Sequence, residues 1–342
     1  MRIVFAGTPA FAVPTLKALH ASRHELAAVY TQPDRPSGRG HKLRPSSVKQ
    51  AALERGLKVV QVEDFKSTQA VDELRAFGAE AMVVVAYGLL LPPPVLEIFP
   101  SACWNLHASI LPRWRGAAPI ARAIEAGDSY TAVAVMKMER GLDTGPILSQ
   151  TEVAIGPDNN AERLQTRLAV LGAELMVVAM DQLSELSGQP LALEAALRVQ
   201  SSDGITYASK LSKAEALLDF GESAMVLERR MRAFDPVPGC FTWVHKAQSG
   251  AAPTLLKCWR ARVHDMDQGA NTHDASAVPY GRVVGFGEAG PIIACAGSCI
   301  ELVEVQPAGG VRLAAMPWAR QFGLKAGDLF GNEALGIDHQ AP

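Results

Sequence analysis

The sequence predicts an α/β protein in which a doubly wound, mostly parallel sheet is followed by a smaller, strand-rich domain. In the first half of the chain, short apolar runs alternate with segments of helical periodicity, and the run 81–86 is apolar at every position. Apolar strands that alternate with helices are typical of a parallel sheet covered on both faces. After about residue 240, short strand-like runs are separated by glycine turns, which is typical of a small barrel.

The elements of the first domain follow from periodicity and from the residues that interrupt it. Gly7, Thr8 and Pro9 end the first strand, and Gly188 and Pro190 follow the end of a long amphipathic helix. We expect strands at 2–6, 25–31, 57–62, 81–86, 102–106, 131–138 and 146–155, and helices at 11–22, 46–56, 68–78, 92–99, 117–126 and 160–186. Such sheets bind ligands at the carboxyl ends of their strands, so a site is expected there.

A chain of 342 residues is too long for one typical core and is expected to form two domains. We place the first domain at 1–189, a linker at 190–208 and the second domain at 209–330. The second domain is expected to hold a helix at 223–234, strands at 241–244, 254–261, 281–286, 292–296 and 299–306, and an exposed polar loop at 264–279.

Composition restricts the class of protein. The 33 lysines and arginines against 35 acidic residues give a formal net charge of −2, which excludes a broadly basic protein but permits a local basic patch. The five cysteines are sparse and irregularly spaced, as is typical of free thiols in a reducing compartment, and they predict no metal site. With no charged leader and no apolar run near 18 residues, we expect a cytoplasmic protein with no membrane contact.

The first strand-to-helix turn differs from that of a nucleotide-binding sheet. It runs from Gly7 to Phe11 with one glycine, whereas a dinucleotide site requires Gly-x-Gly-x-x-Gly. A Walker-type phosphate loop is also missing from the sequence. The predicted Rossmann-like sheet is therefore expected to work without NAD, FAD or ATP.

A long basic segment, 32–45, connects the second strand to its helix. It carries four cations and one acid among five glycines and prolines; the cations are Arg35, Arg39, Lys42 and Arg44. Long ordered loops are often functional, and a mobile basic finger suits a nucleic-acid backbone. The alternative is an ordinary solvated surface loop.

The candidate chemistry lies at Asn105, His107 and Asp143. Asn105 and His107 are two apart on a predicted strand, so their side chains point to the same face. Asp143 lies in the turn that follows a later strand. Each residue alone is typical of a turn or a structural hydrogen bond, but together they follow strand ends and are expected to meet at one edge of the sheet.

These residue types favour acyl transfer between two bound substrates. Ser109 lacks the Gly-x-Ser-x-Gly elbow of a serine hydrolase, and none of the cysteines lies in a nucleophile motif. The nucleophile is therefore expected to come from a substrate, for which an amine is suitable. Asn105 and a protonated His107 can stabilise a tetrahedral oxyanion, while Asp143 supports His107.

At this point the sequence resembles the 10-formyltetrahydrofolate-dependent formyltransferases. The resemblance rests on Asn-Leu-His-Ala-Ser-Ile-Leu-Pro at 105–112, on Arg-Trp-Arg-Gly-Ala-Ala-Pro-Ile at 113–120 and on Leu-Asp-Thr-Gly at 142–145. Supporting segments are 5–9, 32–40, 84–88, 207–213 and 232–236, so the similarity runs from about residue 2 to about residue 310. Trp104 and Ala108 depart from the residues that the family often has there, which concerns pocket shape.

The resemblance implies a full set of roles, with Asn105, His107 and Asp143 as the catalytic residues. It implies that 10-formyltetrahydrofolate is the co-substrate and that initiator methionyl-tRNA, held by its acceptor stem, is the acceptor. Contacts to the folate are then expected from Tyr87, Gly88, Ser109, Ile110, Leu111 and Pro112. Contacts to the tRNA are expected from Arg35, Arg39, Lys42, Arg44 and Lys210. The second domain is implied to be an OB-like β-barrel, and the protein is expected to be a monomer.

Three other functions stay open from the sequence. A related enzyme could formylate an amino sugar nucleotide, or could use water and hydrolyse the formylated folate. A third possibility is an RNA-binding module without catalysis. The basic segment and the barrel favour tRNA over the first two, and the intact polar trio argues against the third.

Overall fold

The computed structural model describes residues 1–37, 42–247, 252–264 and 279–332, and these form two compact units. Unit 1 contains 1–120, 129–155 and 163–209, and unit 2 contains 121–128, 156–162 and the described residues from 210 onward. The segment predicted as a linker, 190–208, therefore belongs to unit 1. Two short pieces from the first half of the chain belong to unit 2, so no single cut in the sequence separates the units.

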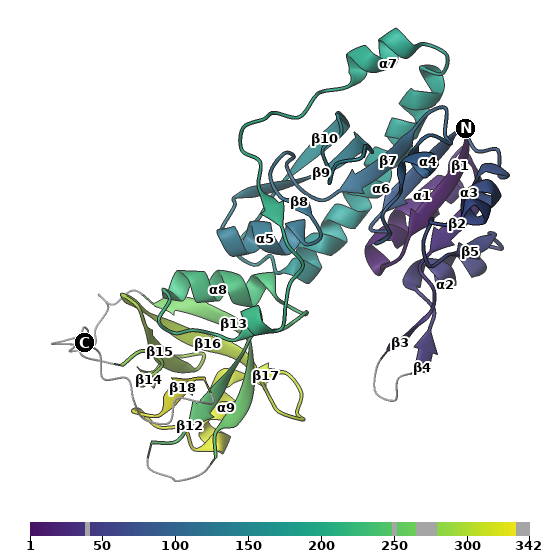
Figure 1. Ribbon diagram of the computed structural model, residues 1–342. Coiled ribbons are helices and arrows are strands. Elements are labelled where there is room, and N and C mark those ends of the chain that lie inside the picture. Colours follow the sequence, from purple (N-terminus) through teal and green to yellow (C-terminus); the bar gives the residue numbers. More distant parts are fainter. Residues whose placement is uncertain (38–41, 248–251, 265–278, 333–342) are drawn as a thin grey trace. The chain divides into compact units, whose positions relative to one another are not determined.

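Unit 1 is built on a seven-stranded, mostly parallel sheet in the order β10-β9-β7-β6-β1-β2-β5 (Figure 1). The five strands from β5 to β7 are parallel, whereas β9 and β10 are antiparallel to their neighbours. The bounds are β1 Arg2–Gly7, β2 Glu25–Thr31, β5 Val59–Gln61, β6 Ala81–Val85, β7 Cys103–His107, β9 Tyr130–Lys137 and β10 Ile147–Ala154. The predicted mostly parallel sheet is confirmed.

Helices cover both faces of this sheet. They are α1 Val13–Ala21 after a 3-10 turn at Ala10–Ala12, α2 Ser47–Leu53, α3 Thr68–Arg75, α4 Pro93–Leu96 and α6 Ala161–Glu185. The helix α7 Pro190–Ala196 has no buried residue, and α5 Pro119–Ala126 lies mostly in unit 2. Ser46 and Ser67 cap α2 and α3 by accepting hydrogen bonds from backbone N–H groups. One core cluster joins alternate residues of β1, β2, β6 and β7 to α3 and α4, which places these two helices on one face.

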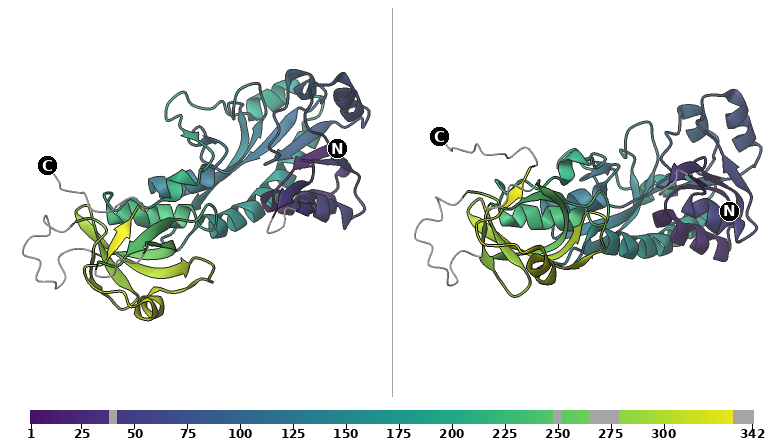
Figure 2. Two further views of the ribbon diagram at one scale, coloured as in Figure 1. Left: turned by 60° about the horizontal axis from the view of Figure 1, so that its bottom comes forward. Right: turned by 90° about the horizontal axis from the view of Figure 1, so that it is seen from below.

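The long helix α6 packs closely on the opposite face, and it runs along the strands in Figure 2. A Cβ at Gly172 would meet Leu106 Cδ2 at 2.6 Å, so any larger residue there would have to displace the Leu106 side chain. Because strand side chains alternate, Leu106 faces α6 while Asn105 and His107 face the other way. The packing of α6 thus fixes which face of β7 is left for the polar pair.

Two smaller pairings complete unit 1. The basic segment contains β3 Arg35–Ser37 and β4 Lys42–Arg44, which pair as an antiparallel hairpin that projects from the sheet (Figure 1). Strand β8 Arg115–Gly116 pairs in parallel with β11 Tyr207–Ala208, and β11 lies in the segment predicted as a linker. Neither pairing follows from apolar periodicity, which is why the sequence predicts loops at both places.

Unit 2 is an antiparallel barrel, as the sequence predicts, with strands in the order β14-β15-β16-β13-β12-β18 and β17 paired to β16. The strands curl, as both views of Figure 2 show, and a bridge between Arg282 and Leu329 joins the two edges. The bounds are β12 Phe241–His245, β13 Thr254–His264, β14 Val283–Phe286, β15 Pro291–Cys295, β16 Ser298–Pro307, β17 Leu313–Ala314 and β18 Leu329–Gly331. Its helices are α8 Ala224–Ala233, α9 Ala315–Phe322 and a 3-10 turn at Ala214–Ala216. The sequence analysis does not predict α9, β17 or β18.

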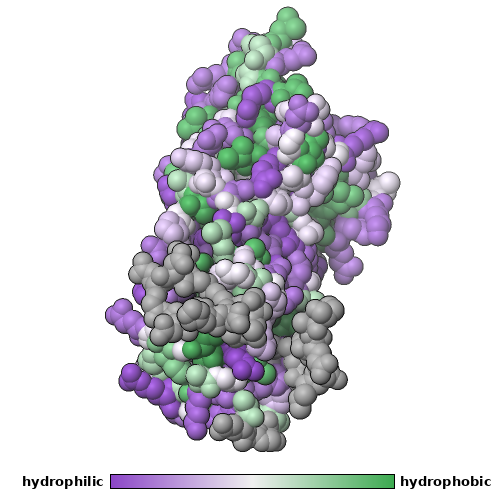
Figure 3. Space-filling view, turned by 90° about the vertical axis from the view of Figure 1, so that its left-hand side faces the viewer, coloured by the Kyte–Doolittle hydropathy of each residue, from purple (hydrophilic) through white to green (hydrophobic). Residues whose placement is uncertain are grey.

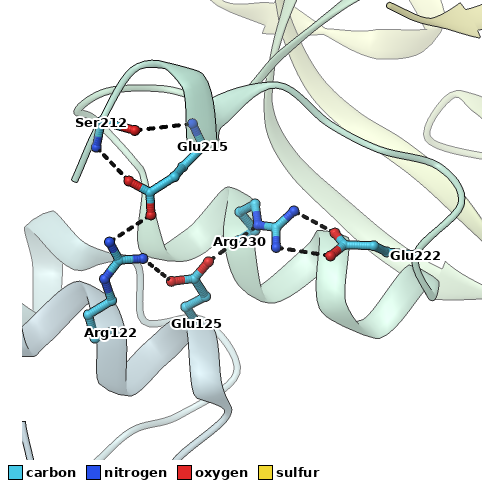
Figure 4. A network of polar contacts seen from close by, with 6 residues as sticks. All are labelled: Arg122, Glu125, Ser212, Glu215, Glu222 and Arg230. Carbon is cyan, nitrogen blue, oxygen red and sulfur yellow. Dashed lines mark hydrogen bonds and ion pairs between the residues drawn. The ribbon is translucent and has the colours of Figure 1, made fainter. Parts of the chain in front are cut away.

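A chain of ion pairs holds the N-terminal piece of unit 2 against α8 (Figure 4). Arg230 of α8 contacts Glu125 at 3.3 Å and Glu222, while Arg122 contacts Glu125 and Glu215 at 2.7 Å each. Burial alone would lower the pKa of Arg122, but its hydrogen bonds to these glutamates outweigh burial and raise the pKa. The five residues are all at most about a third exposed, so the network is fixed and mostly shielded from water.

One face of the protein is coloured by hydropathy in Figure 3. On the face drawn in Figure 3, the described hydrophobic residues lie in small groups among hydrophilic ones. In the described parts of the chain, every helix is too short or too polar to cross a membrane.

Candidate active site

Strand β7 presents Asn105 and His107 on one face, as their spacing predicts. His107 is buried, and its Nε2 lies 2.9 Å from the carbonyl oxygen of Trp114, to which it can donate a hydrogen bond. Asn105 is half-buried, and its side-chain amide makes no hydrogen bond with another described residue. One member of the pair is therefore fixed, while the other has its donors and acceptor available.

Asp143 completes the predicted trio. Its Oδ2 lies 3.6 Å from Nδ1 of His107 and accepts a hydrogen bond of 2.8 Å from the backbone N–H of Gly116. The imidazole of His107 thus has an oxygen on each side, one from Trp114 and one from Asp143. These two oxygens hold the ring in one orientation beside Asn105.

The route by which Asp143 reaches His107 differs from the expectation of one shared strand edge. Strand β9 runs antiparallel to β7, so its last residue, Lys137, pairs with Trp104 rather than with His107. The turn after β9 must return along the sheet to reach His107. It does so with Asp143 in the left-handed region at a φ of 51°. Gly145 lets the chain close, because a Cβ there would meet the Lys137 carbonyl oxygen at 1.9 Å.

A residue that the sequence did not single out, Gln200, holds this turn. Its Nε2 donates hydrogen bonds of 2.8 Å to the carbonyl oxygens of both Asp143 and Gly145. Its Oε1 accepts from Nε and a terminal nitrogen of Arg115, at 3.1 and 2.8 Å. Arg115 is 6% exposed, so this is an internal contact. The available signal was weak, since a glutamine in a segment without periodicity is ordinary in a linker.

The loop from Ser109 to Trp114 forms one wall beside His107. The Ser109 hydroxyl is fully buried and donates to the carbonyl of Arg113 at 2.6 Å, so it stabilises the loop itself. Leu111 is buried in a cluster with β9 and β10 residues, whereas Ile110 and Pro112 are half-exposed. The backbone N–H of Trp114 donates to the Thr206 hydroxyl at 2.9 Å. The segment predicted for folate thus presents Ile110 and Pro112 and uses Ser109 and Leu111 internally.

Tyr87 and Gly88 follow β6 at the carboxyl edge of the parallel strands. The Tyr87 side chain is 1% exposed within the core, and burial raises the pKa of its phenol. Its carbonyl oxygen accepts hydrogen bonds from Thr8 at 2.7 Å and Gln32 at 3.1 Å. Gly88 is exposed, so at this position the backbone rather than the phenol is accessible to a ligand.

The basic hairpin concentrates positive charge away from any acid of its own strands. Arg35 and Arg44 are exposed and lie opposite each other in the β3–β4 register. Like charges in this arrangement destabilise a hairpin unless an anion lies near them. At the hairpin base, Lys49 contacts both Asp34 oxygens at 2.8 and 2.9 Å, and Gln61 donates to Asp34 at 2.9 Å.

The other predicted tRNA contacts are described only in part. The backbone of Lys42 forms part of β4, and Lys210 is exposed at the start of the last segment of unit 2. Arg39 and most of the predicted loop at 264–279 lie outside the described residues. In unit 2, Arg230, Arg232 and Arg260 are paired with acids, so they do not form a free basic face.

Comparison with known proteins relates both parts of the chain to one family. The family described as "Formyl transferase" matches residues 1–180, and "Formyl transferase, C-terminal domain" matches residues 210–323. The methionyl-tRNA formyltransferase of Xanthomonas axonopodis is 45% identical over 92% of this chain and 95% of its own length. That of Variovorax paradoxus is 43% identical over 97% and 99%.

A solved structure shares the fold. The N-formyltransferase of Helicobacter canadensis, in complex with folinic acid and dTDP-3-aminofucose, aligns over 88% of this chain and 98% of its own. The TM-score is 0.60 and the sequence identity is 16%, so this likeness concerns the arrangement of the chain alone.

Proposed function

Because the chain belongs to the formyl transferase family, we propose that it transfers the formyl group of 10-formyltetrahydrofolate to the α-amino group of methionyl initiator tRNA. The observation that carries the proposal is the pairing of a buried His107 with Asp143 beside the available amide of Asn105. Curated relatives that match nearly the whole chain bear the name of this activity. The reaction would take place in the cytoplasm.

The roles of the trio follow from their chemistry. The neutral amine attacks the formyl carbon, a C–N bond forms, and negative charge develops on the formyl oxygen. Asn105 donates hydrogen bonds to that oxygen, and the positive ring of His107 stabilises it electrostatically. Asp143 keeps the ring oriented through the contact between its Oδ2 and Nδ1 of His107. N10 of the folate leaves with a proton, and the amine loses one.

His107 has one geometric requirement to meet. Its Nε2 is directed at the Trp114 carbonyl, 2.9 Å away. For direct donation to the oxyanion, this hydrogen bond must be exchanged for one to the substrate. The loop that contains Trp114 also contains Ile110 and Pro112, which are assigned to the folate. Binding of the folate would therefore act on the loop whose Trp114 carbonyl accepts the hydrogen bond of His107.

The acceptor is assigned from the basic hairpin. Arg35 and Arg44 face each other on adjacent strands, where a phosphate backbone would relieve their repulsion. Asp34, Lys49 and Gln61 fix the base from which the hairpin projects. We assign Arg39, Lys42 and Lys210 to the same acceptor. To the donor we assign Ile110 and Pro112 by their side chains, Tyr87 and Gly88 by their backbone, and Ser109 and Leu111 as residues that hold the wall of its site.

The test follows the fate of the formyl group. Purified protein is incubated with radiolabelled 10-formyltetrahydrofolate and with charged initiator tRNA, with dTDP-3-aminofucose, or with buffer alone. Label recovered on methionine of the tRNA supports the proposal. Label on the sugar or free formate in preference to the tRNA would overturn the assigned acceptor, and tRNA binding without transfer would indicate a module without catalysis.

A further inference from the structure

The segment 198–208 contacts the elements of the proposed active site at both of its ends. The backbone of Arg198 bridges to Ile147, at the start of β10. The Thr206 hydroxyl accepts a hydrogen bond of 2.9 Å from the backbone N–H of Trp114. The Thr206 carbonyl accepts one of 2.9 Å from the backbone N–H of Arg115. The Ala208 carbonyl accepts from the backbone N–H groups of Ala117 and Ala118, which directly follow this loop. These contacts make the segment a support of the loop that ends in Gly116, whose N–H binds Asp143.

Within this segment, Gln200 makes contacts that fix its amide in one orientation. Its Oε1 faces only donors, the two nitrogens of Arg115, and its Nε2 faces only acceptors, the carbonyls of Asp143 and Gly145. A reversed amide would bring its NH₂ against a guanidinium and its oxygen against two carbonyls. The four bonds use both Nε2 protons and both Oε1 acceptor sites, so the side chain is fully committed.

The Asp143 turn depends on such a support. It is not an extension of a strand that ends at His107, since the end of β9 lies beside Trp104. It also places a non-glycine residue at a φ of 51°, a conformation that needs surrounding contacts to persist. The Asp143 carboxylate is held by Gly116, and its main chain is held by Gln200. Of these two hydrogen bonds, loss of Gln200 would leave Asp143 only the one to its carboxylate.

We propose that Gln200, oriented by the buried Arg115, is a positioning residue that sets the rate of formyl transfer by holding Asp143 against His107. The inference rests on the proposed function, since it takes Asp143 to act on His107 during catalysis. It assigns a catalytic purpose to a segment that sequence alone predicts to be a connection. Gln200 itself touches neither substrate in this assignment.

The test is a double-mutant cycle with Gln200→Ala and Asp143→Asn. Gln200→Ala should lower kcat about 100-fold, the effect expected of a small misplacement, with both KM values within about threefold. In the Asp143→Asn background the same change should add less than about threefold, because it acts through Asp143. Gln200→Glu, which sets a carboxylate against two carbonyls, should lower kcat at least as far as the alanine variant.

Gln150→Ala is the matched control. Gln150 also accepts from an arginine of this segment, Arg198 at 3.4 Å, but it does not contact the Asp143 turn. It should keep kcat within about twofold. Unchanged kcat in Gln200→Ala, or an equal further loss in the Asp143→Asn background, would overturn the inference. Full activity of Asp143→Asn alone would instead overturn the proposed catalytic site, so the two failures can be told apart.

Discussion

Nδ1 of His107 lies 3.6 Å from Oδ2 of Asp143, although the strand that leads to Asp143 ends beside Trp104. The pair is 5% and 16% exposed, so water screens its interaction only weakly. Contacts from Gly116 and Gln200, rather than the sheet alone, therefore bring the carboxylate to the imidazole. Substitutions that break or displace the contact between Asp143 and His107 should therefore affect catalysis.

Asp143→Asn should lower kcat by about 100- to 10,000-fold, because the variant keeps the shape but loses the charge that supports His107. Asn105→Ala should lower kcat by about 100- to 1,000-fold through loss of an oxyanion donor. Single-turnover formylation with saturating substrates measures both. Asp181→Asn on α6, which also lies near a histidine, His24 at 3.3 Å, serves as a control and should stay active. Near-normal turnover of a folded His107→Ala variant would contradict the mechanism.

Replacing Arg35 and Arg44 together by alanine should raise KM for the tRNA about 10- to 100-fold and leave KM for the folate unchanged. The plot of log affinity against log salt should become shallower by about 2, one for each phosphate that is no longer neutralised. Filter binding of the tRNA at several salt concentrations gives this slope. Arg75→Ala removes an exposed arginine that is paired with Asp72, and it should change neither quantity. An unchanged slope in the double variant would mean that the hairpin does not bind phosphates.

Glu301 should make unit 2 sensitive to acid. Burial favours its neutral form, but hydrogen bonds from His264 at 3.0 Å and from the backbone of Ala289 and Gly290 outweigh this and lower the pKa of the carboxyl. A carboxyl whose pKa is lower when folded stabilises the protein above its unfolded-state value, about pH 4.3. That stability is lost as the pH falls through the folded-state value.

Glu301→Gln should therefore lower Tm at pH 7 but weaken the fall in Tm that the natural protein shows below about pH 4.5. The loss at neutral pH is expected to be about 1–3 kcal/mol, typical of a charged hydrogen-bond acceptor. Calorimetry between about pH 3.5 and 7, the range in which the Glu301 carboxyl changes its protonation, tests whether the difference in Tm between the two proteins narrows as the pH falls. The exposed Glu288 of the same turn provides the control, and Glu288→Gln should follow the natural protein at every pH.

Arg230→Ala should destabilise unit 2 by about 1–3 kcal/mol, because it leaves Glu222 without its cation and Glu125 with Arg122 alone. Arg320→Ala, an exposed arginine of α9, should cost less than about 0.5 kcal/mol. Urea unfolding followed by tryptophan fluorescence compares the two. Equal midpoints for both variants would show that the ion-pair chain contributes nothing to folding.

The parts of the site that the sequence could predict are those set by local geometry. Asn105 and His107 share a face because strand side chains alternate, and that requires no knowledge of distant residues. The position of Asp143 was harder, since nothing local indicates that β9 runs antiparallel. Gln200 could not be found, because its four partners are backbone and side-chain atoms brought together only by folding. The predicted parallel sheet and barrel, by contrast, follow from periodicity and turn residues.

The hairpin shows the same limit from another side. Its strands carry arginine, proline, serine, lysine and leucine without the alternation that marks a half-buried strand. The side chains at its base, Asp34, Lys49 and Gln61, come from different elements. The sequence therefore predicts a loop, whereas the structure has a hairpin that is held by pairing of β3 with β4 and by the polar contacts at its base.

The composition of unit 2 limits how the gene can be divided. A fragment that begins at residue 210 lacks 121–128 and 156–162, and with them Glu125 and Asn160, the partners of Arg230 and Asp235. Exchanging the barrel between relatives would likewise require three pieces of sequence to be exchanged at once, namely 121–128, 156–162 and the part that begins at residue 210. Recombination at one crossover would combine Arg230 and Asp235 of one relative with the residues that another relative carries at positions 125 and 160. The two units pack separately, but neither is encoded by one continuous stretch of the gene.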